Sequence, residues 1–460
     1  MYWSLSRKPI RIQNIIILIG SYIFYGWWDY RFLSLIVISS IVDYSVGIAL
    51  TKVTRPRWRK YLLLASVSVN LGILGYFKYY GFFVESWVEL LASIGISAHA
   101  STLQIILPVG ISFYTFQTLS YTIDVYRGII APTRDVVAFF AYVSFFPQLV
   151  AGPIERAKNL LPQFLKPRTF DTEAAKDGVR QMLWGLLKKT VVADNLAPHV
   201  DAIFRGSNTA DGLTLFIGVF LFAIQIYCDF SGYSDIAIGT ARIFGFDLMQ
   251  NFAFPYFSRD IAEFWRRWHI SLSTWFRDYV YIPLGGSRTT RFRHIINLII
   301  TFTVSGFWHG ASWTFIVWGF LNGLYYIPLM LLRRHHSNTN TVAEGKLLPS
   351  FTEFGSIALT FCATLFAWVF FRAYSVEHAI QYISSVFLHR WDFAILSFYT
   401  MPLFYSLSIL VVEWFQRGKR HGLEMTGTPI WGRWSIYYVI LFIIFRYGNT
   451  GYVPFIYFQF

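Results

Sequence analysis

Long uncharged stretches separated by short charged loops dominate the pattern of hydrophobic and polar positions in this 460-residue chain. Residues 15–25, 33–42, 61–77 and 103–123 each contain no charged side chain. A helix that crosses a membrane needs about 20 mostly apolar residues, and several of these stretches approach that length alone. The pattern therefore predicts an all-α polytopic membrane protein.

We expect a single membrane domain that covers residues 1–460, because apolar stretches recur along the whole chain without an internal repeat. The more polar residues 153–180 should form short helices at the surface, and the weakly apolar residues 82–96 fit the membrane interface. Residues 333–346 are expected to form a cytoplasmic loop. The predicted spans are residues 12–28, 32–50, 61–77, 103–123, 136–152, 181–198, 213–228, two within 295–332, 355–371, 400–416 and 434–447.

Composition agrees with this class, since 55% of the residues are hydrophobic and 14% are charged, against about 25% charged in soluble domains. The net charge of +14 would suggest a nucleic-acid partner for a soluble protein. Here the basic residues gather in loops between apolar stretches, so they indicate topology and no nucleic-acid partner is expected. The basic segments 7–11 and 51–60 should lie on the cytoplasmic side. The tight connection 26–31 should lie outside, which makes the first two helices a hairpin.

Residues 229–293 are too polar for ordinary spans and are rich in aromatic side chains. Charged or irregular backbone is tolerated at membrane depth where it is buried in protein or lines a wet cavity. An amphipathic helix that lies on the membrane surface is the alternative. The pattern alone leaves both arrangements open.

Nothing in the sequence points to a disulfide framework or a metal centre. Cys228 and Cys362 both lie in apolar stretches and are expected to be small buried hydrophobic residues. His335 and His336 are adjacent, so they do not share one face of a helix as a metal pair would. We therefore expect no bound metal and no other bound cofactor.

His309 is the most informative ionisable residue, because the stretch between His294 and Arg333 holds no other charged or ionisable group apart from tyrosine hydroxyls. This stretch fits two short helices that start and end on the cytoplasmic side. His309 would lie near the turn between them, and Gly306 and Gly310 would let the backbones approach closely. Burial disfavours a charged imidazole, and a neutral one can accept a proton from a hydroxyl. A core histidine that is hydrogen-bonded to a neighbouring helix is the alternative.

His269 is the second candidate, within the sequence FWRRWHISLSTW at residues 264–275. It follows Arg266 and Arg267, and a histidine among arginines is often a surface residue or an anion contact. A direct chemical role and a surface role both stay open for this histidine.

The last residues of the sequence, FIYFQF at 455–460, are apolar and carry no charged side chain. An aromatic cluster at the membrane interface would explain them. A strongly apolar segment is nevertheless unfavourable in water, so we expect it to be bound in a cavity of its own protein. Tyr457 would be its one reactive side chain.

Four segments of the sequence resemble the membrane-bound O-acyltransferase family. WHG at 308–310 and RRWHISLSTWFRDYVYIPLGGSR at 266–288 look like the two signature regions of that family. FFPQLVAGPIER at 145–156 and QIYCDFSGYSDIAIG at 225–239 look like its alginate O-acetyltransferase branch. The resemblance extends over nearly the whole chain, although family members usually begin with another hydrophobic segment before the equivalent of residues 6–11.

This resemblance implies a ring of tilted helices around a central tunnel that narrows from a cytoplasmic and an outer funnel. His309 matches the catalytic histidine near the constriction, and His269 matches the second histidine, in the cytoplasmic funnel. The terminal segment is similar to a motif whose tyrosine is proposed to carry the acyl group, which makes Tyr457 the expected carrier. The resemblance also implies acetyl-CoA as donor, a polysaccharide outside the bacterial cytoplasmic membrane as acceptor, and a partner with a serine-type (SGNH-like) transferase domain.

These expectations combine into one hypothesis, in which neutral His309 accepts the proton of the Tyr457 hydroxyl and the tyrosine oxygen attacks a cytoplasmic thioester. Arg266, Arg267 and Arg277 are the candidates that steer the CoA phosphates, with positive-inside anchoring as the alternative. One rival function is acyl transfer to another acceptor, such as D-alanyl transfer to teichoic acid, or transfer to a lipid or a protein. A rival from another class is a polysaccharide transporter with His309 as a proton relay.

Overall fold

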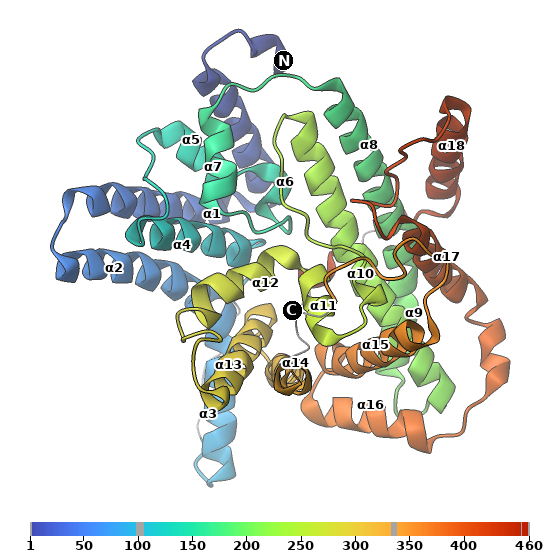
Figure 1. Ribbon diagram of the computed structural model, residues 1–460. Helices are drawn as coiled ribbons and strands as arrows, with labels where there is room; N and C mark the ends of the chain where they lie inside the picture. The colour runs from blue at the N-terminus through green and yellow to red at the C-terminus, as the bar shows by residue number, and fades with distance from the viewer. Residues whose placement is uncertain (1, 98–104, 333–337, 452, 459–460) are drawn as a thin grey trace. The chain divides into compact units, whose positions relative to one another are not determined.

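The computed structural model describes residues 2–97, 105–332, 338–451 and 453–458. Within these ranges the chain forms helices joined by loops, without a strand (Figure 1). The chain divides into two compact units, Met1–Ala175 with Thr240–Met249 and Lys176–Gly239 with Gln250–Phe460. The helical architecture confirms the predicted fold class.

The first unit is built around α1, which packs against α2, α4 and α5. Because α1 is mostly apolar and carries buried small polar residues on one side, it contacts several neighbours along its length. The elements of this unit are η1 (Trp3–Leu5), α1 (Ile10–Lys52), α2 (Pro56–Leu74), η2 (Gly75–Tyr79), α3 (Tyr80–Ser93), α4 (Ile111–Tyr126), α5 (Val136–Val143), α6 (Phe146–Leu149) and α7 (Ala157–Leu165).

Helix α1 breaks at Asp29, whose φ of −159° and ψ of 108° are not helical. The Asp29 carboxylate accepts a hydrogen bond from the backbone N–H of Arg31 at 2.9 Å and pairs with its guanidinium at 2.6 Å. An aspartate in this position satisfies a donor that a new helix start would otherwise leave open. The break therefore lies inside the predicted connection 26–31.

Helices α2 and α3 differ from the prediction, because they form one continuous helical run through the π-helical η2. Together they make a segment of 38 residues, Pro56–Ser93, that is apolar enough to cross a membrane. The weak apolar signal of residues 82–96 comes from Glu85 and Glu89, both of which are exposed. The predicted separate segment is therefore mostly the end of a long helix.

The second unit carries both candidate histidines and the C-terminal segment. Helices α8 and α10 begin or end in the first unit along the chain and contribute most of their length to the second. The elements are α8 (Thr172–Leu186), η3 (Leu187–Ala193), α9 (Asp194–Arg205), α10 (Gly212–Ile243), η4 (Pro255–Phe257), α11 (Ile261–Arg267), α12 (Ile270–Phe276), η5 (Arg277–Tyr281), α13 (Arg291–His309), α14 (Trp313–Leu331), α15 (Phe351–Arg372), α16 (Val376–Leu388), η6 (Phe393–Ser397), α17 (Thr400–Gln416), α18 (Ile430–Tyr447) and η7 (Ile456–Phe458).

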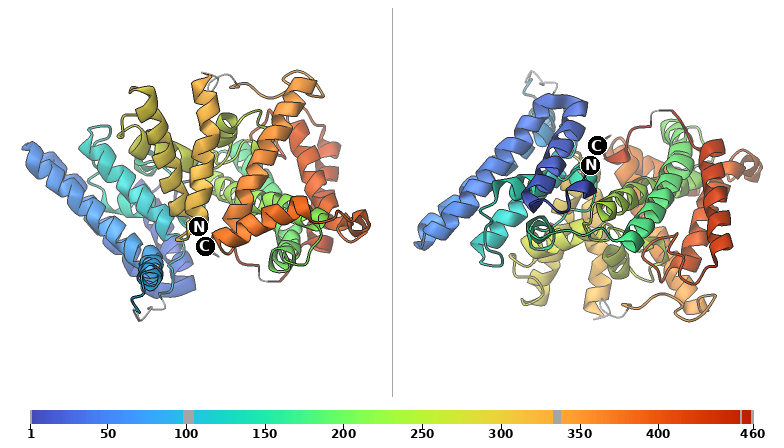
Figure 2. Two further views of the ribbon diagram at one scale, coloured as in Figure 1. Left: turned by 90° about the horizontal axis from the view of Figure 1, so that it is seen from below. Right: turned by 90° about the horizontal axis from the view of Figure 1, so that it is seen from above.

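Helices α13 and α14 form the hairpin that the sequence predicts within residues 295–332, and they lie side by side (Figure 2). Their backbones approach at glycines. A Cβ atom on Gly306 would lie 2.2 Å from the carbonyl oxygen of Phe315, and one on Gly319 would lie 2.4 Å from that of Phe302. The close approach confirms the expectation for Gly306 and places the end of α13 inside the unit.

Five helical segments in the described part of the chain are long and apolar enough to cross a membrane, namely α1, the run α2–α3, α10, α14 and α15. Two predicted spans differ from single regular α-helices: one is divided, and the other runs continuously through a π-helical turn. Residues 136–152 divide into α5 and α6 where Pro147 begins a new helix. Residues 181–198 pass from α8 through the π-helical η3 into α9.

Helix α10 is longer than the predicted span 213–228, and α16 was not predicted at all. The sequence suggested an end at Asp229 because a carboxylate is costly in an apolar helix. The helix continues because Asp229 pairs with Lys189 at 2.8 Å and Asp235 pairs with Lys188 at 2.7 Å. Both lysines lie on η3, so the polar part of α10 is buried against another element.

Candidate active site

His309 is the last residue of α13, at the turn that leads into α14. Its ring lies among aromatic side chains, with centroid distances of 5.2 Å to Trp318 and 5.4 Å to Phe371. A Cβ atom on the next residue, Gly310, would lie 2.1 Å from the ring of Phe315. The turn can therefore be this tight only with glycine at that position, and His309 is 3% exposed.

His269 lies in the short gap between α11 and α12 and is fully buried. Its backbone is in the left-handed region, with φ 43° and ψ 55°. A non-glycine residue there costs about 1–2 kcal/mol, and such strain is often found at functional sites. The buried His269 ring has its centroid 6.4 Å from that of His309.

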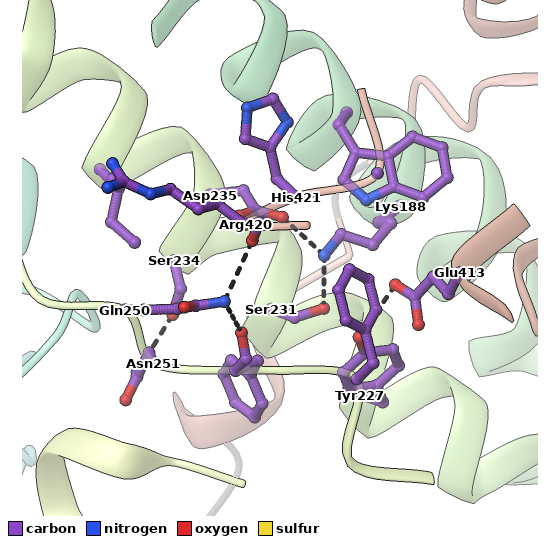
Figure 3. Close-up of a pocket in the computed structure, with 15 residues that line it drawn as sticks. Lys188, Tyr227, Ser231, Ser234, Asp235, Gln250, Asn251, Glu413, Arg420 and His421 are labelled. Atoms are coloured by element: carbon purple, nitrogen blue, oxygen red, sulfur yellow. Dashed lines mark hydrogen bonds and ion pairs between the residues drawn. The ribbon is translucent and has the colours of Figure 1, made fainter. Parts of the chain in front are cut away.

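Asn251 holds His269 in place through several hydrogen bonds. The Asn251 Oδ1 atom lies 3.0 Å from His269 Nδ1 and also accepts from the Ser271 hydroxyl at 2.9 Å. The Asn251 amide nitrogen donates to the Ser234 hydroxyl at 3.1 Å, on the side of the small polar pocket drawn in Figure 3. Because an amide oxygen only accepts, Nδ1 of His269 carries the proton, and Nε2 is the acceptor nitrogen in the neutral ring.

Tyr457, on η7, contacts His309 directly and reaches His269 through Phe230. Its ring centroid lies 5.5 Å from that of His309 and 4.6 Å from that of Phe230. Phe230 is also 4.6 Å from His269, in an edge-to-face contact. Phe230 on α10 thus contacts His269 and Tyr457, and His309 contacts both of these residues directly.

Burial sets the protonation of two of these groups. It lowers the pKa of His269 to about 3, so that this imidazole is neutral at pH 7. Burial also raises the pKa of the Tyr457 hydroxyl well above its usual value of about 10. The phenol is therefore protonated at neutral pH, and it can act as a nucleophile only with the help of a base.

A cavity of about 350 Å³ lies within the second unit, and its lining includes Ile270, the residue after His269, but neither His269 nor His309. Ser305 lines it one helical turn before His309 on α13, and Ser273 lines it one turn after His269. Its walls combine aromatic rings with hydroxyl groups, as small-molecule sites of about 300–1,000 Å³ usually do. A molecule bound in the cavity would therefore contact residues within one helical turn of each histidine.

The three candidate arginines do not occupy equivalent places. Arg266 and Arg277 line the cavity. Arg267 does not line it, because its guanidinium pairs with Glu263 at 2.9 Å and donates to the carbonyl oxygens of Ala253 and Asn340. The structure therefore gives Arg267 a structural position and leaves Arg266 and Arg277 beside the cavity.

Residues 229–276 are mostly buried in protein, which is the first of the two arrangements that the pattern left open, whereas residues 287–293 are exposed. Glu263 and Trp268 are both 1% exposed, although the segment is rich in charge. Glu263 sits between Arg259 and Arg267 in two ion pairs of 3.0 and 2.9 Å. Such pairing makes buried charge tolerable, so the segment is no surface helix.

The pattern of residues along the chain does not single out Asn251, Phe230 or Lys189. Asn251 and Phe230 carry no signal along the chain, since an asparagine in a loop and a phenylalanine in an apolar helix are ordinary.

Cys362 was expected to be buried and is exposed on α15, whereas Cys228 is buried as expected. His335 and His336 lie outside the described residues. In the described part of the chain no group of three or more His, Cys, Asp or Glu side chains could hold a metal ion.

Comparison with known proteins places these features in a family. The model of the membrane-bound O-acyltransferase family matches residues 130–376. A probable alginate O-acetylase of Azotobacter vinelandii is 41% identical over 83% of this chain and 74% of its own length. One of Pseudomonas putida is 37% identical over 98% and 95%. The peptidoglycan O-acetyltransferase of Helicobacter pylori is 33% identical over 83% and 75%.

The matched region includes both histidines and the α13–α14 hairpin that carries His309. The relatives extend the similarity far beyond that region, because the Pseudomonas putida protein aligns with almost the whole chain. The five long apolar helical segments agree with a protein that passes the membrane several times. The chain is a multi-pass membrane protein that belongs to the membrane-bound O-acyltransferase family.

Proposed function

We propose that this O-acyltransferase moves an acetyl group from acetyl-CoA in the cytoplasm to Tyr457, from which it passes to a polysaccharide on the other side of the membrane. The observation that carries the proposal is the contact between His309 and Tyr457, whose ring centroids are 5.5 Å apart in a buried aromatic setting. A base beside a hydroxyl nucleophile is the arrangement that acyl transfer requires.

In the proposed step, His309 accepts the proton of the Tyr457 hydroxyl while the phenolic oxygen attacks the thioester carbonyl carbon. The carbon–sulfur bond breaks, the new oxygen–carbon bond makes an acetyl ester of tyrosine, and the departing thiolate takes the proton from the imidazolium to leave as free CoA. Holding the reacting groups together supplies much of the rate, because the step becomes intramolecular within the complex.

The cavity of about 350 Å³ supports a donor site beside the histidines. Arg266 and Arg277 line it and could pair with phosphate groups of CoA, while its hydroxyl and aromatic lining suits the pantetheine arm. We assign His269 to this side, because Ile270 and Ser273 on the same turn line the cavity. No metal or other cofactor takes part in the proposed reaction.

The acceptor is proposed from the relatives, which are described as alginate and peptidoglycan O-acetylating proteins. We place the chain in the bacterial cytoplasmic membrane, and a polysaccharide of this kind lies outside that membrane. The acetyl ester would face outward and pass to a serine-type (SGNH-like) transferase partner. The partner would exchange the tyrosine ester for a serine ester and then acetylate a sugar hydroxyl.

The test is to incubate the purified protein in detergent with radiolabelled acetyl-CoA and to follow both free thiol and label on the protein. We expect wild type to acquire label, and His309→Ala and Tyr457→Phe to lose it. Tyr233→Phe is the matched control, because the Tyr233 ring contacts that of Phe455 in the same segment, with centroids 5.4 Å apart. It should keep its label.

Each other outcome points to a rival. Label lost in His309→Ala but kept in Tyr457→Phe would contradict Tyr457 as the carrier and place the acetyl group on another residue of the protein. Thiol release by the wild type without label on the protein would instead direct the acyl group to another acceptor, such as a lipid or teichoic acid. Intact acetyl-CoA in the wild type, with the partner added, would contradict this donor and favour another donor or polysaccharide transport.

A further inference from the structure

The C-terminal segment is tied to the second unit directly after α18. The Asn449 backbone N–H donates to the carbonyl oxygen of Thr190 at 2.9 Å, and its side-chain amide donates to that of Asp194 at 3.2 Å. The Asn195 side chain donates to the carbonyl oxygen of Tyr447 at 2.8 Å. These bonds fix the start of the segment on η3 and the first turn of α9.

A second attachment lies next to Tyr457 itself. The backbone N–H of Ile456 donates to Asp229 Oδ2 at 2.7 Å, on α10. The other oxygen of Asp229 pairs with Lys189 Nζ at 2.8 Å, and Lys189 also pairs with Asp194 at 2.7 Å. Lys189 Nζ thus links two residues that bind the C-terminal segment after α18, called the tail below. Asp229 accepts from Ile456, and the carbonyl oxygen of Asp194 accepts from Asn449.

Asp229 and Phe230 are consecutive, and both act on the tail. Asp229 accepts from the residue before Tyr457, while Phe230 packs on the Tyr457 ring at 4.6 Å. A backbone hydrogen bond and an aromatic contact from neighbouring residues of one helix fix the register of the tail. If the tail slipped by one residue, the phenol would no longer face His309.

We propose that Lys189, Asp229 and Asp194 form an ionic clamp that holds the C-terminal segment in the register that presents Tyr457 to His309. The three are positioning residues, since they contact the tail backbone or each other rather than the reacting atoms. The purpose of the clamp rests on the proposed function, whereas its hold on the tail does not. A buried ion pair is weak evidence for stability, so its cost is better explained by such positioning.

Lys188, the residue next to Lys189, provides a control for the role of Lys189 in the clamp. Lys188 Nζ pairs with Asp235 at 2.7 Å and contacts the Ser231 hydroxyl at 2.8 Å, as Figure 3 shows. The two ion pairs join the same two elements, η3 and α10, and the Lys188 side chain is 3% exposed against 21% for Lys189. The bonds of Lys188 go to α10, whereas those of Lys189 reach the carboxylate that binds the tail. The π-helical turn of η3 carries both lysines, and π turns are frequent at functional sites.

The experiment compares Lys189→Met and Asp229→Asn with Lys188→Met in the full-length protein. Hydrogen exchange followed by mass spectrometry measures the peptide that carries the Ile456 amide, and labelled acetyl-CoA measures acyl transfer. We expect Lys189→Met and Asp229→Asn to speed exchange of that amide at least about tenfold and to lower labelling by up to about 100-fold, as misplacement by about 1 Å can do. Lys188→Met should change neither, even if it lowers the melting temperature.

Unchanged exchange in Lys189→Met would overturn the clamp, and so would equal acceleration in Lys188→Met, since loosening would then be general. Hydrogen exchange of the Ile456 amide tests whether the clamp holds the tail, even if the protein shows no acyl transfer. A wild type without label, but with a slow Ile456 amide that Lys189→Met accelerates, would contradict the carrier role of Tyr457 and still support the clamp. Faster exchange with full labelling would overturn the positioning role.

Discussion

The two units both bury ionisable groups among apolar helices, but they satisfy them in different ways. In the first unit Asp43 on α1 is fully buried and accepts hydrogen bonds from the hydroxyls of Ser66 and Thr122 and from the amide of Asn70 at 2.8 Å. In the second unit His309 contacts Tyr457, and residues within one helical turn of His269 and His309 line a cavity.

The Asp43 cluster and the proposed site differ in the chemistry of the neighbours around the buried ionisable group. These three hydrogen-bond partners of the Asp43 carboxylate are all donors. They lie on α2 and α4, so the cluster connects α1 to these two helices. Around His309 the neighbours are aromatic, and the polar partner is a phenol that a base can activate. Burial of an ionisable group in the membrane thus suggests a function. The groups that surround it distinguish a structural role from a chemical one.

The largest expected effect comes from removing the base or the nucleophile. His309→Gln should lower acetyl transfer about 10²- to 10⁴-fold, because a general base usually contributes that much. The measurement is release of CoA thiol per folded molecule, with melting temperature as the check on folding. Activity within a few-fold of wild type would place His309 with Asp43 as a structural residue.

A smaller effect is expected from Asn251, which holds His269 in one tautomer. Asn251→Ala should lower acetyl transfer about 10- to 100-fold at every pH, through misplacement of the ring. Asn251→Asp should instead give a pH-dependent loss. A carboxylate beside Nδ1 favours the imidazolium, so it raises the pKa of His269 from about 3, and activity falls as the pH drops through the new value.

The pH–rate profile of the purified enzyme between pH 5 and 8 is the measurement. In wild type His269 stays neutral over this range, since its pKa is about 3, so its titration should cause no acid limb there. An acid limb in Asn251→Asp that is missing in Asn251→Ala would support the assignment. Identical profiles in the two variants would remove Asn251 from the site.

A still smaller effect is expected at the cavity wall. Arg266→Gln and Arg277→Gln should each raise KM for acetyl-CoA by about 3- to 10-fold and change kcat little, because partly exposed charge pairs contribute modestly. Arg293→Gln is the control, as Arg293 is exposed and does not line the cavity. Equal shifts in all three variants would indicate a general effect of positive charge instead of a donor site.

The smallest effect on chemistry is expected in the first unit. Asp43→Asn should leave acetyl transfer per folded molecule unchanged but lower the free energy of unfolding by about 1–3 kcal/mol, since one amide donor would face that of Asn70. Thermal unfolding in detergent measures the stability change. A loss of transfer with unchanged stability would show that Asp43 has a chemical role after all.

The sequence predicted the helical membrane fold, the hairpin around His309 and the break near Asp29, because each follows from local patterns of charge, glycine and apolar length. It also selected His269, His309 and Tyr457, whose roles remain predictions. The ring and tunnel implied by the resemblance and the single domain over residues 1–460 remain predictions as well.

What the sequence could not predict depends on contacts between distant residues. The true end of α10 was hidden because the partners of Asp229 and Asp235 lie some 40 residues earlier along the chain, at Lys189 and Lys188. Arg267 looks like Arg266 in the sequence, and only the pairing with Glu263 separates them. Asn251 can be recognised as a partner of His269 only in the structure, where its amide oxygen lies 3.0 Å from His269 Nδ1.

The central claim, that Tyr457 receives the acetyl group with His309 as its base, can be tested by mass spectrometry of the C-terminal peptide. The protein is incubated with acetyl-CoA without its partner, quenched in acid, digested and examined with and without hydroxylamine, which cleaves phenolic esters. The account predicts one acetyl group on Tyr457 in the wild type, removed by hydroxylamine and missing from His309→Gln. An acetylated wild-type protein whose C-terminal peptide stays unmodified would contradict it.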